Sequence, residues 1–202
     1  MGGNKKGTIS QNTASTYFSI LKAGLKQAFV DEYLTVDIGA KVKGITNIEK
    51  TRVALSMNEV QMLVDTPCKD DVLKRAFLFS ILTGLRHSDI QTLKWKQIQQ
   101  TSKGTWQAVI VQQKTKRPDY KPVIQQALQL CGERPNDEET LVFEGLTDAS
   151  WISRPLKVWI EASGIKKHIT FHCGRHSFAS LLLENGVDIY TIKDLMGHTN
   201  VR

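Results

Sequence analysis

Two helical segments near the end of the chain set strict demands on its fold. The first, residues 172–184, carries Phe178, Leu181 and Leu182 at the spacing of a buried helix face. The second covers residues 188–196. An Asn-Gly pair ends the first segment and a glycine ends the second, as expected for helix C-termini. Because an apolar face of this kind is typical of a core, other parts of the chain must pack against it.

The rest of the chain predicts mostly helices and one small sheet. A capping box at Ser56-Met57-Asn58-Glu59 opens a helix, and Thr83-Gly84 breaks another before a new helix near Ser88. We predict further helices at 8–34, 70–82 and 150–163, strands at 106–112, 120–124 and 141–143, and a turn at 116–119. The fold class is therefore mainly α with a small antiparallel β-sheet (α+β).

The chain divides by composition near residue 50. Residues 35–50 are polar and basic with two glycines, which is typical of a linker. A single helix cannot bury its own apolar face, so the helix before this linker is expected to belong to a larger helical domain or to pack on the second one. We predict two parts, 1–50 and 51–202.

Composition limits the environment and the partners. There is no apolar run long enough to span a membrane and no secretory leader, so we predict no membrane partner. The three cysteines are widely spaced, which argues against disulfides and structural zinc and favours the cytoplasm. The net charge of +7 favours a polyanionic partner, nucleic acid first, with a merely basic surface as the alternative.

Four segments carry residues suited to phosphate chemistry. Arg86 begins a helix in Thr83-Gly84-Leu85-Arg86-His87-Ser88-Asp89-Ile90, with Asp89 three residues on, where it can orient the guanidinium or the helix start. Lys114 follows a strand and enters a basic hairpin. In His172-Cys173-Gly174-Arg175-His176 the spacing places His172 and Arg175 on one helix face. His198 follows Gly197 after the last helix.

The order Arg, Lys, His-x-x-Arg, Gly-His resembles the tyrosine recombinases, or phage-type integrases. The segments TGLRHSDI, QQKTKRP and HCGRHSFASLLLENGVDIYTIKDLMGH are similar to that family's motifs, and the resemblance covers residues 52–202. It implies a catalytic-domain fold for 51–202. It further implies that residues 1–50 are the C-terminal helix of a core DNA-binding domain plus a linker.

The resemblance implies site-specific recombination or integration, for a mobile element, through a 3′-phosphotyrosyl intermediate. Arg86 and Arg175 would bind the non-bridging oxygens of the scissile phosphate, because their forks bind bidentately and stay charged. Lys114, or alternatively Lys116, would protonate the leaving 5′-oxygen. His172 would assist proton transfer or position the phosphate, and His198 would donate a hydrogen bond to it. No metal and no cofactor are implied.

The family's nucleophilic tyrosine lies beyond the Gly-His pair, on a following helix. This chain ends at Arg202, and Tyr190 precedes His198, so we predict no nucleophile within it. Residues 1–202 should therefore bind double-stranded DNA without forming the covalent link, mainly as a monomer. The resemblance implies a tetramer on two DNA sites for the parent protein, in the bacterial cytoplasm at the nucleoid.

Several alternatives stay open beside this interpretation. A DNA-binding relic or regulator would keep the fold without catalysis, and a type IB topoisomerase-like enzyme would share the catalytic groups. His172 and His176 could form a helical zinc pair, although Arg175 would repel a cation. Ser177 could be a nucleophile beside His176, although adjacent helix residues point apart. The basic run at 166–168 could contact DNA phosphate or simply be solvated.

Overall fold

The computed structural model describes residues 9–49, 51–111 and 118–197. The chain separates into two compact units, which we call unit 1 (Met1–Thr51) and unit 2 (Arg52–Arg202). Each unit is described by itself. Within the described residues, no helix has the length and apolar character needed to cross a membrane.

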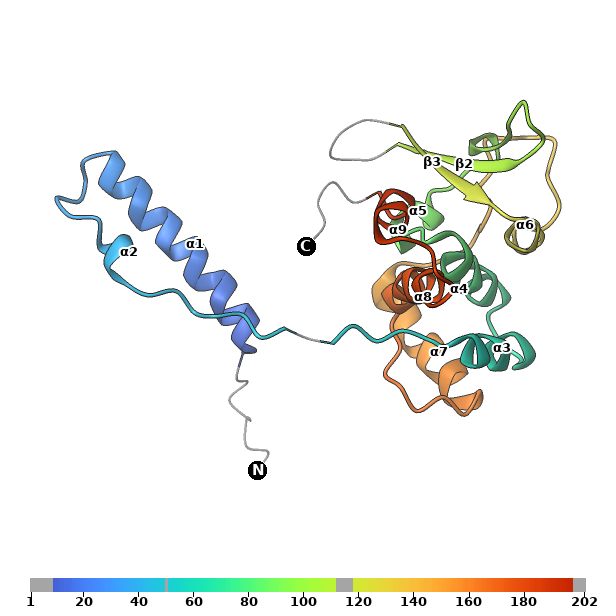
Figure 1. The fold of residues 1–202 in the computed structure, drawn as a ribbon, viewed down its shortest axis with the longest axis horizontal. Coiled ribbons are helices and arrows are strands. Elements are labelled where there is room, and N and C mark those ends of the chain that lie inside the picture. The colour runs from blue at the N-terminus through green and yellow to red at the C-terminus, as the bar shows by residue number, and fades with distance from the viewer. Residues whose placement is uncertain (1–8, 50, 112–117, 198–202) are drawn as a thin grey trace. The chain divides into compact units, whose positions relative to one another are not determined.

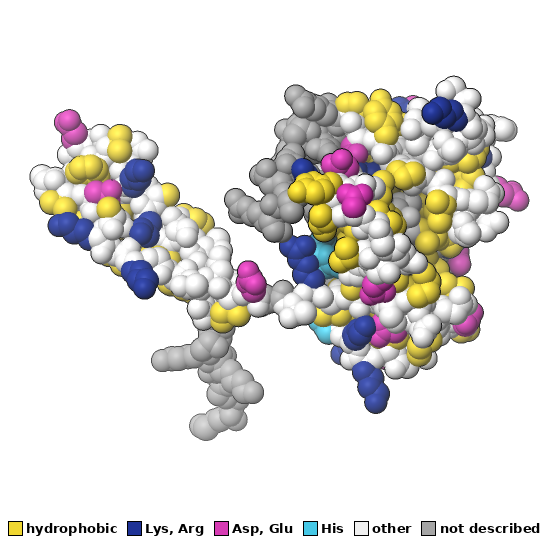
Figure 2. Space-filling view, in the orientation of Figure 1, with side chains coloured by type: hydrophobic (Ala, Val, Ile, Leu, Met, Phe, Trp, Pro, Cys, Tyr) yellow, Lys and Arg dark blue, Asp and Glu magenta, His cyan; other side chains and the backbone are white. Residues whose placement is uncertain are grey.

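Unit 1 is built on one long helix. Helix α1 (Gln11–Val30) begins at Ser10, whose side chain accepts a hydrogen bond from the Thr13 amide. A short α2 (Ile38–Lys41) lies inside the stretch predicted to be a linker. The Ser15 hydroxyl donates to the Ile45 carbonyl at 2.8 Å, so the segment after α2 runs back along α1. Many large apolar side chains of this unit are exposed (Figure 2), among them Ile9, Tyr17, Ile20, Leu21, Val30 and Tyr33.

Unit 2 is mainly helical and holds the core. Helix α4 (Asp71–Thr83) packs against α8 (Phe171–Glu184) and α6 (Gln125–Cys131), and its buried side chains belong to the main hydrophobic cluster. In the view of Figure 1 the sheet lies at one end of this unit and α7 at the other. The helices are α3 (Met57–Asp65), α4 (Asp71–Thr83), α5 (His87–Gln91), α6 (Gln125–Cys131), α7 (Ala149–Ala162), α8 (Phe171–Glu184) and α9 (Ile189–Leu195).

The predicted helix signals have clear structural counterparts. Ser56 and Glu59 form the capping box at the start of α3, with the Ser56 amide donating to the Glu59 carboxylate at 2.8 Å. Gly84 ends α4 in the left-handed region, with φ of 69°. The mainly helical fold class with one small antiparallel sheet is confirmed.

The sheet has three antiparallel strands in the order β1-β2-β3. They are β1 (Ile98–Gln100), which follows the 3-10 turn η1 (Trp95–Gln97), β2 (Trp106–Val111) and β3 (Pro118–Val123). Val111 pairs with Pro118 and Ile110 with Asp119. The predicted turn at 116–119 was therefore wrong for its last two residues, because they extend β3.

The predicted third strand at 141–143 was also wrong. Leu141 makes only an isolated bridge to Lys94, and the next residues form a turn. Val142 and Phe143 are apolar because they fill the core, where both are buried. The third strand is β1, whose polar sequence Ile-Gln-Gln leaves only its first side chain buried. Helix α6 was not predicted either.

Candidate active site

The turn between α4 and α5 is fixed by close packing around Gly84. A Cβ atom added at Gly84 would lie 2.6 Å from Cδ1 of Phe178 on α8, and its positive φ also disfavours other residues. The chain can therefore reverse here directly against α8. This turn brings Arg86, two residues later, to the first turn of α5.

Arg86 lies at the N-terminus of α5 with its side chain about half exposed to solvent. Its amide donates to Oδ2 of Asp89 at 3.2 Å, and its Nη1 lies 3.8 Å from the same oxygen. The first contact is a hydrogen bond and the second only a loose ion pair. Asp89 therefore holds the start of α5, while the guanidinium remains open to a ligand.

Arg175, on α8, is buried, with 2% of its surface exposed. Its Nη1 donates to the Gly84 carbonyl and its Nη2 to the Met196 carbonyl, next to the end of α9. Burial, and then the charge of Arg86, lower the pKa of Arg175 to about 10, with Asp89 and Asp119 opposing. The group stays charged at neutral pH and ties α8 to the α4–α5 turn and to α9.

His172 is exposed on the first turn of α8, one turn before Arg175. Its ring meets that of His176 edge to face, with the centroids 4.5 Å apart. Partial loss of solvation first, and then the charges of Arg175, Arg86 and Arg52, lower the pKa of His172 from its ordinary value. His172 is therefore neutral near pH 7 and able to accept a proton.

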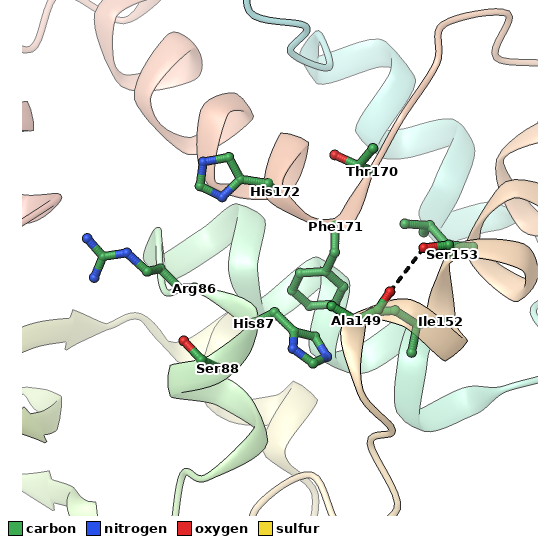
Figure 3. A pocket seen from close by; sticks show the side chains of 10 residues that line it. Arg86, His87, Ser88, Ala149, Ile152, Ser153, Thr170, Phe171 and His172 are labelled. Carbon is green, nitrogen blue, oxygen red and sulfur yellow. Dashed lines mark hydrogen bonds between the residues drawn. The ribbon is translucent and has the colours of Figure 1, made fainter. Parts of the chain in front are cut away.

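Arg86 and His172 border the same pocket, a cavity of about 400 Å³. Figure 3 shows the side chains of Arg86 and His172 directed to the same side, with the rings of Phe171 and His87 next to each other. The His87 ring packs edge to face on Phe171 with the centroids 4.9 Å apart. The apolar part of the wall comes from Ala149, Ile152, Leu156 and Phe171, and the hydroxyl groups from Ser88, Ser153 and Thr170.

Two charged residues beside this site were missed in the sequence. Lys121 is buried on β3, and its Nζ lies 2.7 Å from Oδ2 of Asp119. Burial lowers the pKa of Lys121; Asp119 opposes this shift, and the charges of Arg175 and Arg86 add to it. The available signal was the spacing of Asp119, Lys121 and Val123, which places all three on one face of β3. A lysine in that pattern is easily taken for an exposed residue.

The remaining predicted residues fall into two groups. Lys114, its alternative Lys116, and His198 lie outside the described residues. Ser177 is fully buried: its hydroxyl donates to the Cys173 carbonyl and accepts from the Leu55 amide, both at 2.8 Å, so it holds the start of unit 2 on α8. Within the described residues, no cluster of three or more His, Cys, Asp or Glu side chains could hold a metal ion.

The basic run at 166–168 divides in its contacts. Lys167 donates to Oε2 of Glu59 at 2.6 Å and to the Ala54 carbonyl at 2.9 Å, so it is engaged within the fold. All three residues line a separate cavity of about 550 Å³ beside the end of α7. The three residues thus share a surface pocket, and Lys167 is also engaged in an ion pair with Glu59.

Comparison with known proteins gives consistent matches. Residues 54–202 match the phage integrase family. Tyrosine recombinase XerD of Listeria innocua is 27% identical over 209 residues, which cover 95% of this chain and 69% of that protein. XerD of Listeria monocytogenes is 34% identical over 132 residues, 59% of this chain, and that match spans only 43% of the relative's length.

Solved structures share the fold. A lambda integrase dimer bound to a COC′ core site aligns with a TM-score of 0.72 at 21% identity, covering 94% of this chain and 73% of that one. The XerA recombinase aligns with a TM-score of 0.60 at 20% identity, covering 95% and 76%. A lambda integrase tetramer bound to a Holliday junction aligns with a TM-score of 0.72 at 21% identity, covering 94% and 59%.

Proposed function

This chain belongs to the phage integrase family, whose curated relatives are tyrosine recombinases, and we propose that it binds double-stranded DNA and supplies the phosphate-activating groups for site-specific strand cleavage and rejoining. One observation carries the proposal. Arg86, Arg175 and His172 come from two helix starts brought together by the Gly84 turn, and their charges act on one another. An exposed cation, a buried cation and a neutral imidazole at one place suit a phosphodiester.

The chemistry assigns a task to each group. Arg86 binds a non-bridging oxygen of the scissile phosphate. Arg175, which is buried, adds positive charge to the site. A tyrosine oxygen attacks phosphorus while the bond to the 5′-oxygen breaks. Lys114, or alternatively Lys116, gives its proton to that oxygen, and His172 takes the tyrosine proton. We place His198 as a hydrogen-bond donor to the phosphate.

Rejoining is the reverse of this step. A 5′-hydroxyl attacks the 3′-phosphotyrosyl link, its proton passes to the lysine, and tyrosine leaves with the proton held by His172. One phosphodiester replaces another, so no nucleotide cofactor is consumed. We propose that no metal takes part.

The nucleophile is proposed to lie outside the tyrosines of this chain. Tyr120 is exposed on the face of β3 opposite Lys121, and Tyr190 is exposed in the first turn of α9, at the end away from the contacts of Arg175. Neither position favours attack on a phosphate held by Arg86. We further propose that residues 1–202 are monomeric alone and that the complete recombinase assembles as a tetramer on two DNA sites.

A joining assay tests the catalytic groups without requiring a protein nucleophile. The substrate is a nicked duplex carrying a synthetic 3′-phosphotyrosine and an adjacent 5′-hydroxyl, with randomised flanks because the recognition site is unknown. Residues 1–202 should seal the nick and release tyrosine, and sequencing the sealed strands should reveal the preferred site. A matched duplex ending in a plain 3′-phosphate should stay open, since it has no leaving group of comparable quality.

The other outcomes are also informative. Salt-sensitive DNA binding without joining would favour a non-catalytic DNA-binding protein. Joining with no preference in the flanks, together with relaxation of supercoiled plasmid, would favour a topoisomerase. DNA affinity that does not change with salt would contradict every nucleic-acid interpretation, because phosphate contacts release counterions.

A further inference from the structure

Lys121 occupies a core-facing position of β3. Residues at every second position of a strand share a face, so Lys121 faces the same way as Asp119 and Val123. Its backbone partner across the sheet is Ala108, which is fully buried. Only 2% of the Lys121 side chain is exposed. A buried ammonium is costly unless it is paired and hydrogen-bonded, so its partners should explain its presence.

Those partners connect three elements. Nζ of Lys121 lies 2.7 Å from Oδ2 of Asp119 on the same strand and 3.4 Å from the Asp194 carbonyl on α9. Arg175 of α8 donates to the Met196 carbonyl, two residues further along. Two buried cations therefore meet the C-terminal carbonyls of α9, where a helix favours positive charge.

Asp119 is the anion of this group. Its carboxylate pairs with Lys121 and also stabilises the charged form of Arg175. The charged residues that act on Lys121 are Asp119, Arg175 and Arg86. Arg175 is thus held by hydrogen bonds to the Gly84 and Met196 carbonyls, and Asp119 favours its charged form.

We propose that Lys121 and Asp119 are positioning residues for strand joining, which hold the C-terminal end of α9 and Arg175 in the geometry that the phosphate requires. The inference rests on the proposed function. Lys121 is too deeply buried to touch DNA in this structure, so it acts through Arg175 and α9. Residues that support a reacting group in this manner change activity by about 10- to 100-fold when they are removed.

The test compares Lys121→Met with Lys121→Arg in the joining assay at saturating DNA. Methionine keeps the length of the chain and loses the charge, so the joining rate should fall about 10- to 100-fold while the DNA dissociation constant changes less than about twofold. Arginine can donate to the same carbonyls and should restore most of the rate. A structural role alone would not separate rate from affinity or show this rescue.

A matched control is Lys94, which directly precedes η1. Lys94 pairs with Glu139 at 2.9 Å, but both side chains are well exposed. Lys94→Met removes a lysine from an ion pair of similar length and should leave the joining rate within about twofold, because exposed pairs contribute little. Should Lys121→Met fail to fold, Asp119→Asn/Lys121→Met removes both charges together, and the same loss of rate is expected of it.

A readout without catalysis separates this inference from the proposed function. The Gly197 amide donates to the Asp194 carbonyl at 2.9 Å, next to Lys121. Its hydrogen exchange should speed up about tenfold in Lys121→Met and stay unchanged in Lys94→Met. Unchanged exchange, or a folded double variant that joins at the wild-type rate, would overturn the inference. A wild-type chain that fails to join while Lys121→Met still loosens Gly197 would count against the proposed function and would confine Lys121 to placing α9.

Discussion

Arg175 and Arg86 carry the same guanidinium group, but one is buried and the other is about half exposed. Arg175 is buried, and its nitrogens donate to carbonyls at the end of α4 and just beyond α9. Arg86 is about half exposed at the start of α5, and its nearest anion, Asp89, lies 3.8 Å away. One guanidinium is held by the fold, and the other stands at the edge of an open pocket.

The difference separates two ways of binding a phosphate. A buried cation is expensive to desolvate, but once its hydrogen bonds are made it needs no rearrangement when the ligand arrives. An exposed cation costs little in the free protein and must lose its freedom on binding. Arg175 should therefore matter to both folding and chemistry, and Arg86 mainly to chemistry.

The largest effect is expected from Arg175→Ala. Joining should fall by at least about a thousandfold, because positive charge at the phosphate is lost. The free energy of unfolding should fall by about 3 kcal/mol, because two buried carbonyls lose their donor. Single-turnover joining and urea unfolding measure the two losses. Arg175→Lys, which keeps a charge without the planar fork, should recover stability more than activity, and equal recovery of both would contradict the assigned role.

Arg86→Ala should affect activity almost alone. We expect joining to fall by about 100- to 1000-fold, while the free energy of unfolding changes by less than about 0.5 kcal/mol. DNA binding measured by fluorescence anisotropy should weaken only modestly. If DNA affinity and joining rate fell by the same factor, Arg86 would serve to bind DNA. Its proposed role in the chemical step would then be contradicted.

The pKa of His172 responds to the charges of both Arg175 and Arg86, so the pH dependence of joining tests their influence. Joining should decline about tenfold per pH unit below the pKa of His172, because His172 and the lysine are then both protonated and the lysine can no longer accept the proton of the attacking 5′-hydroxyl. The pKa of His172 in the folded protein lies below its ordinary value of 6.5. Its contribution to the free energy of unfolding is therefore complete above pH 6.5 and is lost as the pH falls through the folded-state pKa. Arg86→Ala removes one of the charges and should shift the acid limb toward higher pH. A limb that stays in place would show that His172 does not control it.

The smallest effect is expected from Asp89→Ala. The Arg86 amide would lose its acceptor at the start of α5, which should lower the free energy of unfolding by about 1 kcal/mol. Joining should fall only a few-fold, because the loose 3.8 Å ion pair contributes little to fixing the guanidinium. Thermal unfolding and the joining assay provide both values. A loss as large as that of Arg86→Ala would mean that Asp89 orients the guanidinium itself.

Local signals in the sequence predicted much of this architecture. The capping box at Ser56, the stop at Gly84 and the pairing of β2 with β3 depend on neighbouring residues, and the structure has all three. Leu141–Phe143 failed as a strand because Val142 and Phe143 are apolar for packing, a property that a strand and a buried turn share. Strand β1 is polar and short, so its pairing with β2 left no local mark.

The candidate site divides in the same way. The segments containing Arg86, His172 and Arg175 could be recognised from residue order, and the structure brings these residues close enough for their charges to interact. The burial of Arg175 and Lys121 could not be predicted, because it depends on contacts between segments far apart in the chain. A lysine at 121 looks solvated until β3 is seen against α4 and α9.

The long reach of these contacts also bears on how the protein is made. Arg175 and Gly84 are separated by 91 residues, and Leu55 and Ser177 by 122. A nascent chain emerging from the ribosome therefore exposes Arg86 well before α8 and α9 exist to complete its surroundings. At that stage the basic, incompletely synthesised chain can attract nucleic acid, but it lacks the buried cation Arg175. The ability to act on DNA should thus arise only after α8 and α9 have been synthesised.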